Sequence, residues 1–300
     1  MPTDDSRRKI MLLPMLALIA LAVAWSCYWL VASELGKRMA ATKRAELQQV
    51  GVSLFCRDEA WGGYPFRFEL DCHRPVLTFR DGAEIAFDQL RAVTMAYNPW
   101  HVLLLIEGPT TLDTPLLGQT SIEHGRAVIS LAFSSGDAPR LSAEVQKPVI
   151  RDVFLADRIM LHTRPVSHAT EIALSIEGFL HKTDTGPEIS VDRAELIGTL
   201  GSELLVEKLS LEHDKVRLWG EGNVLLDPER RFAGKLSMQT NDLSGFLDIL
   251  EPHLTLTERQ RASMRTVLGL LGNATRADIV AQQGQLFLGP FKVADLTALF

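Results

Sequence analysis

The chain has 300 residues, is 46% hydrophobic and carries a formal net charge of −6. Three basic and two acidic residues give the first 32 positions a charge of +1, which leaves −7 on residues 33–300. An acidic exterior repels phosphate backbones, and the sequence has no cluster of Lys and Arg with interleaved aromatic residues. Nucleic acid is therefore excluded as a partner.

The first feature along the chain is an uncharged, strongly apolar stretch from Ile10 to Ala32. As a helix, this stretch would be about 35 Å long, enough to cross a hydrocarbon core of roughly 30 Å. A cleaved signal peptide is the alternative, but it would have a shorter apolar run and small residues before its cleavage site. Trp25, Tyr28 and Trp29 instead indicate an interfacial aromatic belt at the distal end of a spanning helix. We expect an uncleaved, single-pass transmembrane anchor over residues 10–32.

Charge alone does not orient this anchor. Three basic residues precede it, and four follow it: Lys37, Arg38, Lys43 and Arg44. Cys56 and Cys72 lie 16 positions apart and are the only cysteines after the anchor, which suits a disulfide in an oxidising compartment; two unrelated thiols are the alternative. We therefore expect residues 1–9 to form a cytoplasmic tail and the rest of the chain to lie outside the cytosol.

Residues 33–50 are expected to continue the helix as a juxtamembrane stalk. Charged residues surround Leu35, Met39 and Leu47, and Gly36 is the only Gly or Pro in the segment. A solvated helix is the simpler interpretation, and contact of its basic residues with lipid phosphates is the alternative.

From residue 51 onward, apolar and polar residues alternate as in half-buried strands. Ile172, Leu174 and Ile176 show this pattern, and further strand pairs are expected around residues 129–145, 193–212 and 216–238. Gly220 and Gly222 share the inward phase of the neighbouring aliphatic residues, which predicts a bulge or a sharp bend in a curved sheet.

Two helices are expected within residues 241–271, the first capped by Asn241 or Asp242 and the second by Thr257. A last pair of strands follows at residues 277–281 and 285–288.

The predicted fold is therefore mainly β with a few helices: an N-terminal transmembrane helix followed by an elongated, curved antiparallel β-sheet domain. This domain would span residues 51–300, with a division near residues 164–165 as the alternative.

Residues 61–70, between the two cysteines, read WGGYPFRFEL. Here the chain resembles the DUF2125 family of uncharacterised, single-pass proteins of Gram-negative cell envelopes. That family has a membrane helix, a similar core often flanked by cysteines, and a closing element that residues 283–290 match, except that Gln283 replaces the usual acidic residue. The resemblance implies a bacterial inner-membrane protein with a periplasmic domain and no assigned activity. Its expected architecture is similar to that of lipid-handling AsmA-type proteins.

The motif itself has a structural and a functional interpretation. Gly62 and Gly63 allow positive φ or close backbone approach, and Pro65 fixes a turn before an alternating strand. In the structural interpretation, this is a bent strand entry held by the disulfide. In the functional one, three aromatic residues form a lip for an apolar ligand or partner: Trp61, Tyr64 and Phe66.

No sequence motif points to catalysis. The chain lacks a nucleophile elbow, a glycine-rich phosphate loop, a zinc-protease motif and a CxxC pair, and its eight histidines have no ligand spacing. We expect no catalytic residue, no cofactor and no metal.

Three hypotheses follow for the function. The first is a non-enzymatic, membrane-anchored periplasmic protein that binds an apolar ligand such as lipid in cell-envelope maintenance, because inward aliphatic residues beside inward glycines would leave a groove. The alternative is a scaffold for another envelope protein. The third is a periplasmic hydrolase, in which a pair such as Asp184/Glu188 or Asp152/Asp157 would serve as acid and base.

Overall fold

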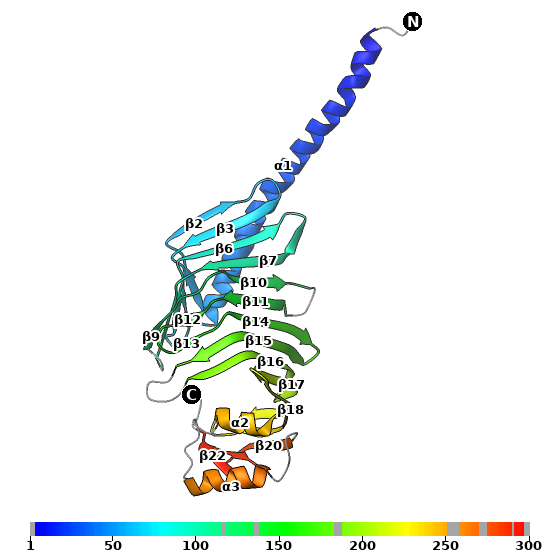
Figure 1. The fold of residues 1–300 in the computed structure, drawn as a ribbon. Helices are drawn as coiled ribbons and strands as arrows, with labels where there is room; N and C mark the ends of the chain where they lie inside the picture. The colour runs from blue at the N-terminus through cyan, green and yellow to red at the C-terminus, as the bar shows by residue number, and fades with distance from the viewer. Residues whose placement is uncertain are drawn as a thin grey trace. The chain divides into compact units, whose positions relative to one another are not determined.

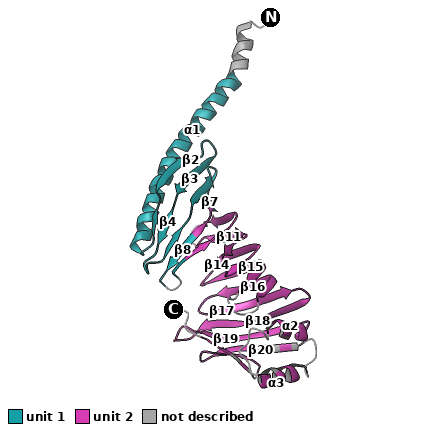
Figure 2. Ribbon diagram, turned by 60° about the vertical axis from the view of Figure 1, so that its left-hand side comes forward, with its two compact units in different colours: residues 1–106, 111–119 teal, residues 107–110, 120–300 magenta. Residues whose placement is uncertain are grey.

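The computed structural model describes residues 4–115, 118–134, 138–182, 188–250, 258–269, 275–289 and 291–296. Backbone contacts divide the chain into two compact units (Figure 2). Unit 1 comprises Met1–Ile106 and Thr111–Gln119, and unit 2 comprises Glu107–Thr110 and Thr120–Phe300.

This division differs from the single domain expected over residues 51–300. Arg164 and Pro165, the alternative point of division, lie inside a strand and pair with Glu171 and Thr170 of the next one. The chain passes between the units within residues 107–120 instead, where no shift in composition marks a linker.

Helix α1 (Asp4–Gln49) contains both the apolar stretch and the stalk without interruption (Figure 1). In the described part of the chain, α1 is the one helix that is long and apolar enough to cross a membrane. Residues 13–24 are exposed on all sides. From Trp25 onward, half-buried residues recur along α1 with helical spacing: Trp25, Trp29, Ala32, Ser33, Gly36, Ala40 and Arg44. Three of them, Trp25, Trp29 and Arg44, form hydrogen bonds with β2 (Asp58–Gly62), β3 (Arg67–His73) or the turn between these strands. The stalk is thus packed along one side rather than solvated all round.

Unit 1 holds two sets of antiparallel strands. One set pairs in the order β2 (Asp58–Gly62), β3 (Arg67–His73), β6 (Gln89–Met95). The other pairs in the order β1 (Ser53–Phe55), β4 (Val76–Thr78), β5 (Glu84–Ala86), β8 (Thr110–Thr114). Strands β7 (Asn98–Glu107) and β9 (Gly118–Ile122) complete this part of the chain. The predicted disulfide is present: it joins Cys56, which follows β1, to Cys72 of β3 and so connects the two sets.

Unit 2 is a ladder of antiparallel strands in the order β10–β11–β14–β15–β16–β17–β18–β19–β20–β21–β22. Its strands are β10 (Ala127–Ala132), β11 (Arg140–Gln146), β14 (Arg158–Val166), β15 (Ala169–His181), β16 (Ile189–Leu200), β17 (Leu204–His213), β18 (Val216–Leu226), β19 (Phe232–Thr240), β20 (Thr275–Gln282), β21 (Gln285–Leu288) and β22 (Phe291–Asp295). The short strands β12 (Val149–Ile150) and β13 (Phe154–Leu155) pair with each other, and β13 also pairs with β15.

Two helices follow β19, namely α2 (Leu243–Leu250) and α3 (Glu258–Gly269). Of the two predicted caps, Asp242 is the one used: its carboxylate accepts a hydrogen bond from the backbone N–H of Gly245 at 3.0 Å. The side-chain oxygen of Asn241 instead accepts a hydrogen bond from the backbone N–H of Arg217 in β18. Thr257 lies outside the described residues.

The predicted fold class is confirmed, since antiparallel sheets follow one long apolar helix. The predicted bulge is also present. The β17–β18 register shifts between Val206 and Leu209, whose partners are Gly222 and Gly220. A Cβ on Gly222 would lie 2.0 Å from the carbonyl oxygen of Lys235 in β19, so the close approach of the backbones requires a glycine there.

Candidate functional sites

The GYPFRF motif, residues 63–68, contains the turn between β2 and β3. Side chains of helix α1 form hydrogen bonds with the backbone of this motif. The indole N–H of Trp25 donates a hydrogen bond to the carbonyl oxygen of Pro65 at 2.9 Å. The indole N–H of Trp29 donates to the carbonyl oxygen of Arg67, also at 2.9 Å. One carbonyl group in the turn and one at the first residue of β3 thereby accept hydrogen bonds from α1.

The turn between β6 and β7 meets the same part of the helix. The hydroxyl of Tyr28 donates to the carbonyl oxygen of Ala96 at 2.7 Å, and the backbone N–H of Ala96 donates to the carbonyl oxygen of Phe66 at 2.8 Å. Ala96 has no exposed surface. The two turns are therefore joined to each other and to one helix. We call the three donors, Trp25, Tyr28 and Trp29, the aromatic clamp.

Ring contacts accompany these hydrogen bonds. The ring of Trp29 stacks on that of Phe68 with centroids 5.7 Å apart and meets Tyr64 edge-on at 5.3 Å. Trp25 lies 6.2 Å from Phe66. Aromatic pairs of this kind contribute about 0.5–1.5 kcal/mol beyond their buried area, so the rings and the hydrogen bonds together fix the turn on the helix.

One of the two motif glycines has a conformational role. Gly63 has a φ of +99°, and a Cβ at this position would lie 2.6 Å from the carbonyl oxygen of Arg67. A Cβ on Gly62 would meet nothing within 4 Å. Both properties expected from the glycine pair, positive φ and close backbone approach, thus belong to Gly63.

The structure places the three residues predicted to form a lip in two different settings. Tyr64 and Phe66 are 59% and 61% exposed at the β2–β3 turn and contact the aromatic clamp. Trp61 is half-buried in β2, and its indole N–H donates to the Oε1 atom of Glu59 at 2.7 Å. The Oε2 atom of Glu59 accepts a hydrogen bond from Arg44 of α1 at 2.6 Å. Trp61 therefore belongs to a second contact between α1 and β2.

The protonation of Glu59 depends on this contact. Partial burial disfavours its charged form, but hydrogen bonds from Arg44 and Trp61 and the positive charge of Arg44 outweigh the burial. The pKa of Glu59 therefore lies below its ordinary value, and the carboxylate is charged at neutral pH.

The second candidate site is the apolar face of the unit 2 ladder. The strand registers place Leu161 opposite Leu174, Leu174 opposite Leu196, and Leu196 opposite Leu209. The same face carries aliphatic side chains from β10 to β21, including Ile129, Ala143, Leu161, Leu174, Leu196, Leu209, Leu218, Met238, Ile279 and Leu288. Most of these side chains are only half-buried. We call this surface the apolar face.

The opposite face of the ladder is polar. Arg158 forms an ion pair with Glu177 at 2.7 Å, and Lys208 forms one with Glu195 at 2.6 Å. Ion pairs at this degree of exposure contribute little to stability, but they show which side of the sheet faces water. The ladder is thus amphipathic across its strands.

Helix α2 covers one end of the apolar face. Its Leu243 is 6% exposed and lies with Phe246 over Leu218, Met238 and Leu288. Next to the part of the apolar face under α2 lies an apolar cavity of about 260 Å³ over β18–β21. Its lining includes Val224, Phe232, Leu236, Ala281, Leu286 and Leu296. The cavity has the chemistry of a binding site for hydrocarbon.

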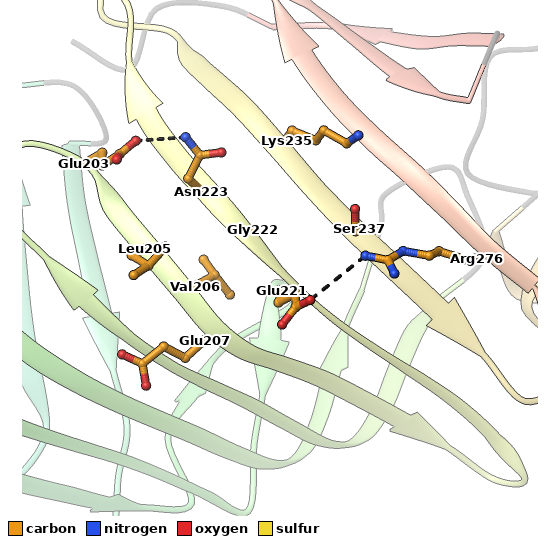
Figure 3. A pocket seen from close by; sticks show the side chains of 10 residues that line it. All are labelled: Glu203, Leu205, Val206, Glu207, Glu221, Gly222, Asn223, Lys235, Ser237 and Arg276. Atoms are coloured by element: carbon orange, nitrogen blue, oxygen red, sulfur yellow. Dashed lines mark hydrogen bonds and ion pairs between the residues drawn. The ribbon is translucent and has the colours of Figure 1, made fainter.

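A larger open depression of about 650 Å³ lies over β17–β20, and most of its lining comes from the polar face (Figure 3). Its charged groups are already paired. Asn223 donates to Glu203 at 2.8 Å, and Arg276 lies 4.0 Å from Glu221. Lys235 lies 2.6 Å from Asp278.

The hydrogen bond from Lys235, with one from Ser237, holds the pKa of Asp278 below its ordinary value. Asp278 is therefore a charged, paired carboxylate at neutral pH. This arrangement is typical of a solvated sheet surface.

Only one of the two carboxylate pairs of the hydrolase hypothesis, Asp152/Asp157, lies wholly within the described residues. Asp152 and Asp157 are both exposed, and no hydrogen bond joins their side chains. Asp184 lies outside the described residues. Within the same described ranges, no three His, Cys, Asp or Glu side chains come together as a metal site.

These features define a β-rich protein with one helix fit to span a membrane and an amphipathic ladder of strands. The chain belongs to the DUF2125 family, described as uncharacterized proteins conserved in bacteria, whose family model matches residues 29–297. No match was found among curated proteins or among solved structures. The resemblance inferred from the WGGYPFRFEL segment is confirmed.

Sequence reasoning missed the partner of this motif. It placed Trp25, Tyr28 and Trp29 at the membrane boundary but did not connect them with Pro65, and it said nothing of the β6–β7 turn around Ala96. One signal was available: residues 95–100 read MAYNPW, and a turn rich in apolar and aromatic residues is unusual at a water-exposed position.

Proposed function

We propose that this protein is a non-enzymatic, single-pass protein of the bacterial inner membrane, and that its periplasmic unit 2 binds lipid acyl chains in cell-envelope maintenance. The observation that carries the proposal is the apolar face, an aliphatic surface that runs across the ladder while most of its side chains remain half-buried. Exposed apolar surfaces of such extent mark sites of ligand, membrane or protein binding.

The chemistry of the apolar face favours an acyl chain as the ligand. A hydrocarbon chain needs no hydrogen-bond partners and gains from aliphatic contacts alone, at about 25 cal/mol for each Å² removed from water. The cavity lined by β18–β21 adds apolar walls to this surface. The paired charges of the opposite face support a binding role over a catalytic one.

The aromatic clamp supports an anchor that is retained in the mature protein. Cleavage of residues 10–32 as a signal peptide would remove Trp25, Tyr28 and Trp29 and leave three carbonyl groups without their donors. A removable segment is not expected to supply the contacts that hold a folded turn. The location outside the cytosol agrees with the disulfide between Cys56 and Cys72.

Photocrosslinking tests the proposal. A photoreactive phenylalanine analogue placed at Leu196 would lie on the apolar face, whereas the same analogue at Ile197 would lie on the polar face, where Ile197 is 40% exposed opposite Lys208. The two sites are adjacent in β16, so labelling and expression are closely matched. The full-length protein would be crosslinked in cells, purified in mild detergent and analysed by lipid mass spectrometry.

Lipid adducts at position 196 well above those at position 197 would support the proposal. Equal adduct levels at the two positions, or none at either, would overturn it. A protein adduct of defined mass at position 196 would favour the scaffold alternative instead. Thermal unfolding of both variants would show that each is folded.

A further inference from the structure

We infer that the β2–β3 and β6–β7 turns of unit 1 insert into the membrane interface beside α1. The inserted surface consists of five exposed side chains, which we call the rim: Tyr64, Phe66, Met95, Tyr97 and Trp100. The inference rests on the proposed span of α1, but it does not depend on lipid binding by unit 2.

The first argument is depth. A helix needs about 20 residues to cross the hydrocarbon core, so a span that begins at Ile10 ends close to Trp29. The aromatic clamp lies in this last part of the span and holds both turns by direct hydrogen bonds. Groups bonded to the helix at this level must lie at the level of the lipid, because each hydrogen bond is less than 3 Å long.

The second argument is composition. Turns at the surface of a soluble protein are usually polar, yet the rim residues are exposed by 59% for Tyr64, 61% for Phe66, 38% for Met95, 73% for Tyr97 and 64% for Trp100. Three of the five are Tyr or Trp, whose rings combine an apolar body with a polar tip. Such rings concentrate at the boundary between lipid and water.

The third argument concerns the backbone. Irregular backbone is tolerated at membrane depth only where its polar groups are satisfied by the protein. The carbonyl groups of Pro65, Arg67 and Ala96 meet this requirement, since each accepts a hydrogen bond from the aromatic clamp. The bilayer interface is thus the occupant that explains both the exposed rings and the carbonyl groups that are hydrogen-bonded by side chains of α1.

Thiol accessibility tests the inference in the full-length protein. In a background in which the free thiol is removed by Cys27→Ser, single cysteines would be introduced at Tyr97, Leu18 and Val50, which are 73%, 67% and 65% exposed. Position 97 reports the rim and position 18 the anchor. Position 50 is the water-exposed control, because it lies about 32 Å along α1 from Trp29. Each variant would be placed in phospholipid nanodiscs and treated with a membrane-impermeant maleimide.

We expect the cysteine at position 97 to react at least about tenfold more slowly than that at position 50, since burying one apolar side chain shifts an equilibrium by this factor or more. Position 18 should also be protected, and all three cysteines should react alike in denaturing detergent. Equal rates at positions 97 and 50, with position 18 protected, would overturn the inference and leave the anchor in place. A reactive position 18 would overturn the anchor and, with it, the insertion of the rim.

Discussion

The indole N–H of Trp29 donates to the carbonyl oxygen of Arg67 at 2.9 Å while its ring stacks on Phe68. One side chain of the apolar helix thus contacts both the backbone and an aromatic ring of the WGGYPFRFEL segment. This contact joins the apolar helix to a segment 38 positions away in the sequence.

Replacement of Trp29 by Phe separates the hydrogen bond from the stacking. The variant keeps an aromatic ring against Phe68 but removes the hydrogen bond to the exposed carbonyl group of Arg67, a loss of about 0.5–1.5 kcal/mol. Thermal unfolding of unit 1 in nanodiscs would measure the loss. Trp219→Phe, at a 40% exposed position of unit 2, is the control and should change stability by less than about 0.5 kcal/mol.

The two motif glycines offer a matched pair of variants. Gly63→Ala places a Cβ 2.6 Å from the carbonyl oxygen of Arg67 at a φ of +99°, so we expect the β2–β3 turn to be disrupted and unit 1 to be destabilised by more than about 1 kcal/mol. Gly62→Ala meets open space and should be tolerated. Limited proteolysis and thermal unfolding would compare them, and equal tolerance of both would refute the role given to Gly63.

Removal of the disulfide should weaken unit 1. Cys56 and Cys72 close a loop with a sequence separation of 16, and a bridge over a loop of this size contributes about 3 kcal/mol in the chain-entropy model. The double variant Cys56→Ala/Cys72→Ala should lower the unfolding midpoint, whereas Cys27→Ala, at an exposed free thiol, should not. Mass spectrometry with and without reductant would verify the bridge.

The contact between Arg44 and Glu59 should make unit 1 sensitive to acid. The folded pKa of Glu59 lies below the ordinary value of 4.5, so the stabilisation is complete above that pH and is lost as the pH falls through the folded value. Glu59→Gln should lower stability at neutral pH and flatten its decline in acid. Glu46→Gln is the control, because Glu46 forms an exposed ion pair with Lys43 within α1, the helix that also contains Arg44. An unchanged acid profile for Glu59→Gln would contradict this assignment.

Local pattern was sufficient for much of the fold. The alternation of Ile172, Leu174 and Ile176 predicted β15, and the strand pair expected around residues 216–238 is present as β18 and β19. In the turn between these two strands, the N–H of Arg230 donates to the carbonyl oxygen of Asp227. Such features depend on neighbours in the sequence, which periodicity and turn chemistry describe well.

The candidate sites depend on distant partners and were predicted less completely. The belt of Trp25, Tyr28 and Trp29 was recognised from its amphipathic rings, but periodicity does not identify the carbonyl groups that accept their hydrogen bonds. The division into two units falls within residues 107–120, where the sequence shows no shift in composition. Trp61 was grouped with Tyr64 and Phe66 by proximity in sequence, although its indole binds Glu59.

The unbroken course of α1 has a mechanical consequence. Helix α1 contacts the strands of unit 1 near its middle through the aromatic clamp and near its end through Arg44. Two separate contacts of this kind leave no hinge between the helix and these strands. A helix adapts to a thicker or thinner bilayer chiefly by changing its angle to the membrane normal. In the proposed single-pass arrangement, the strands of unit 1 must follow each such change with α1, and a variation in bilayer thickness thereby becomes a rotation of these strands.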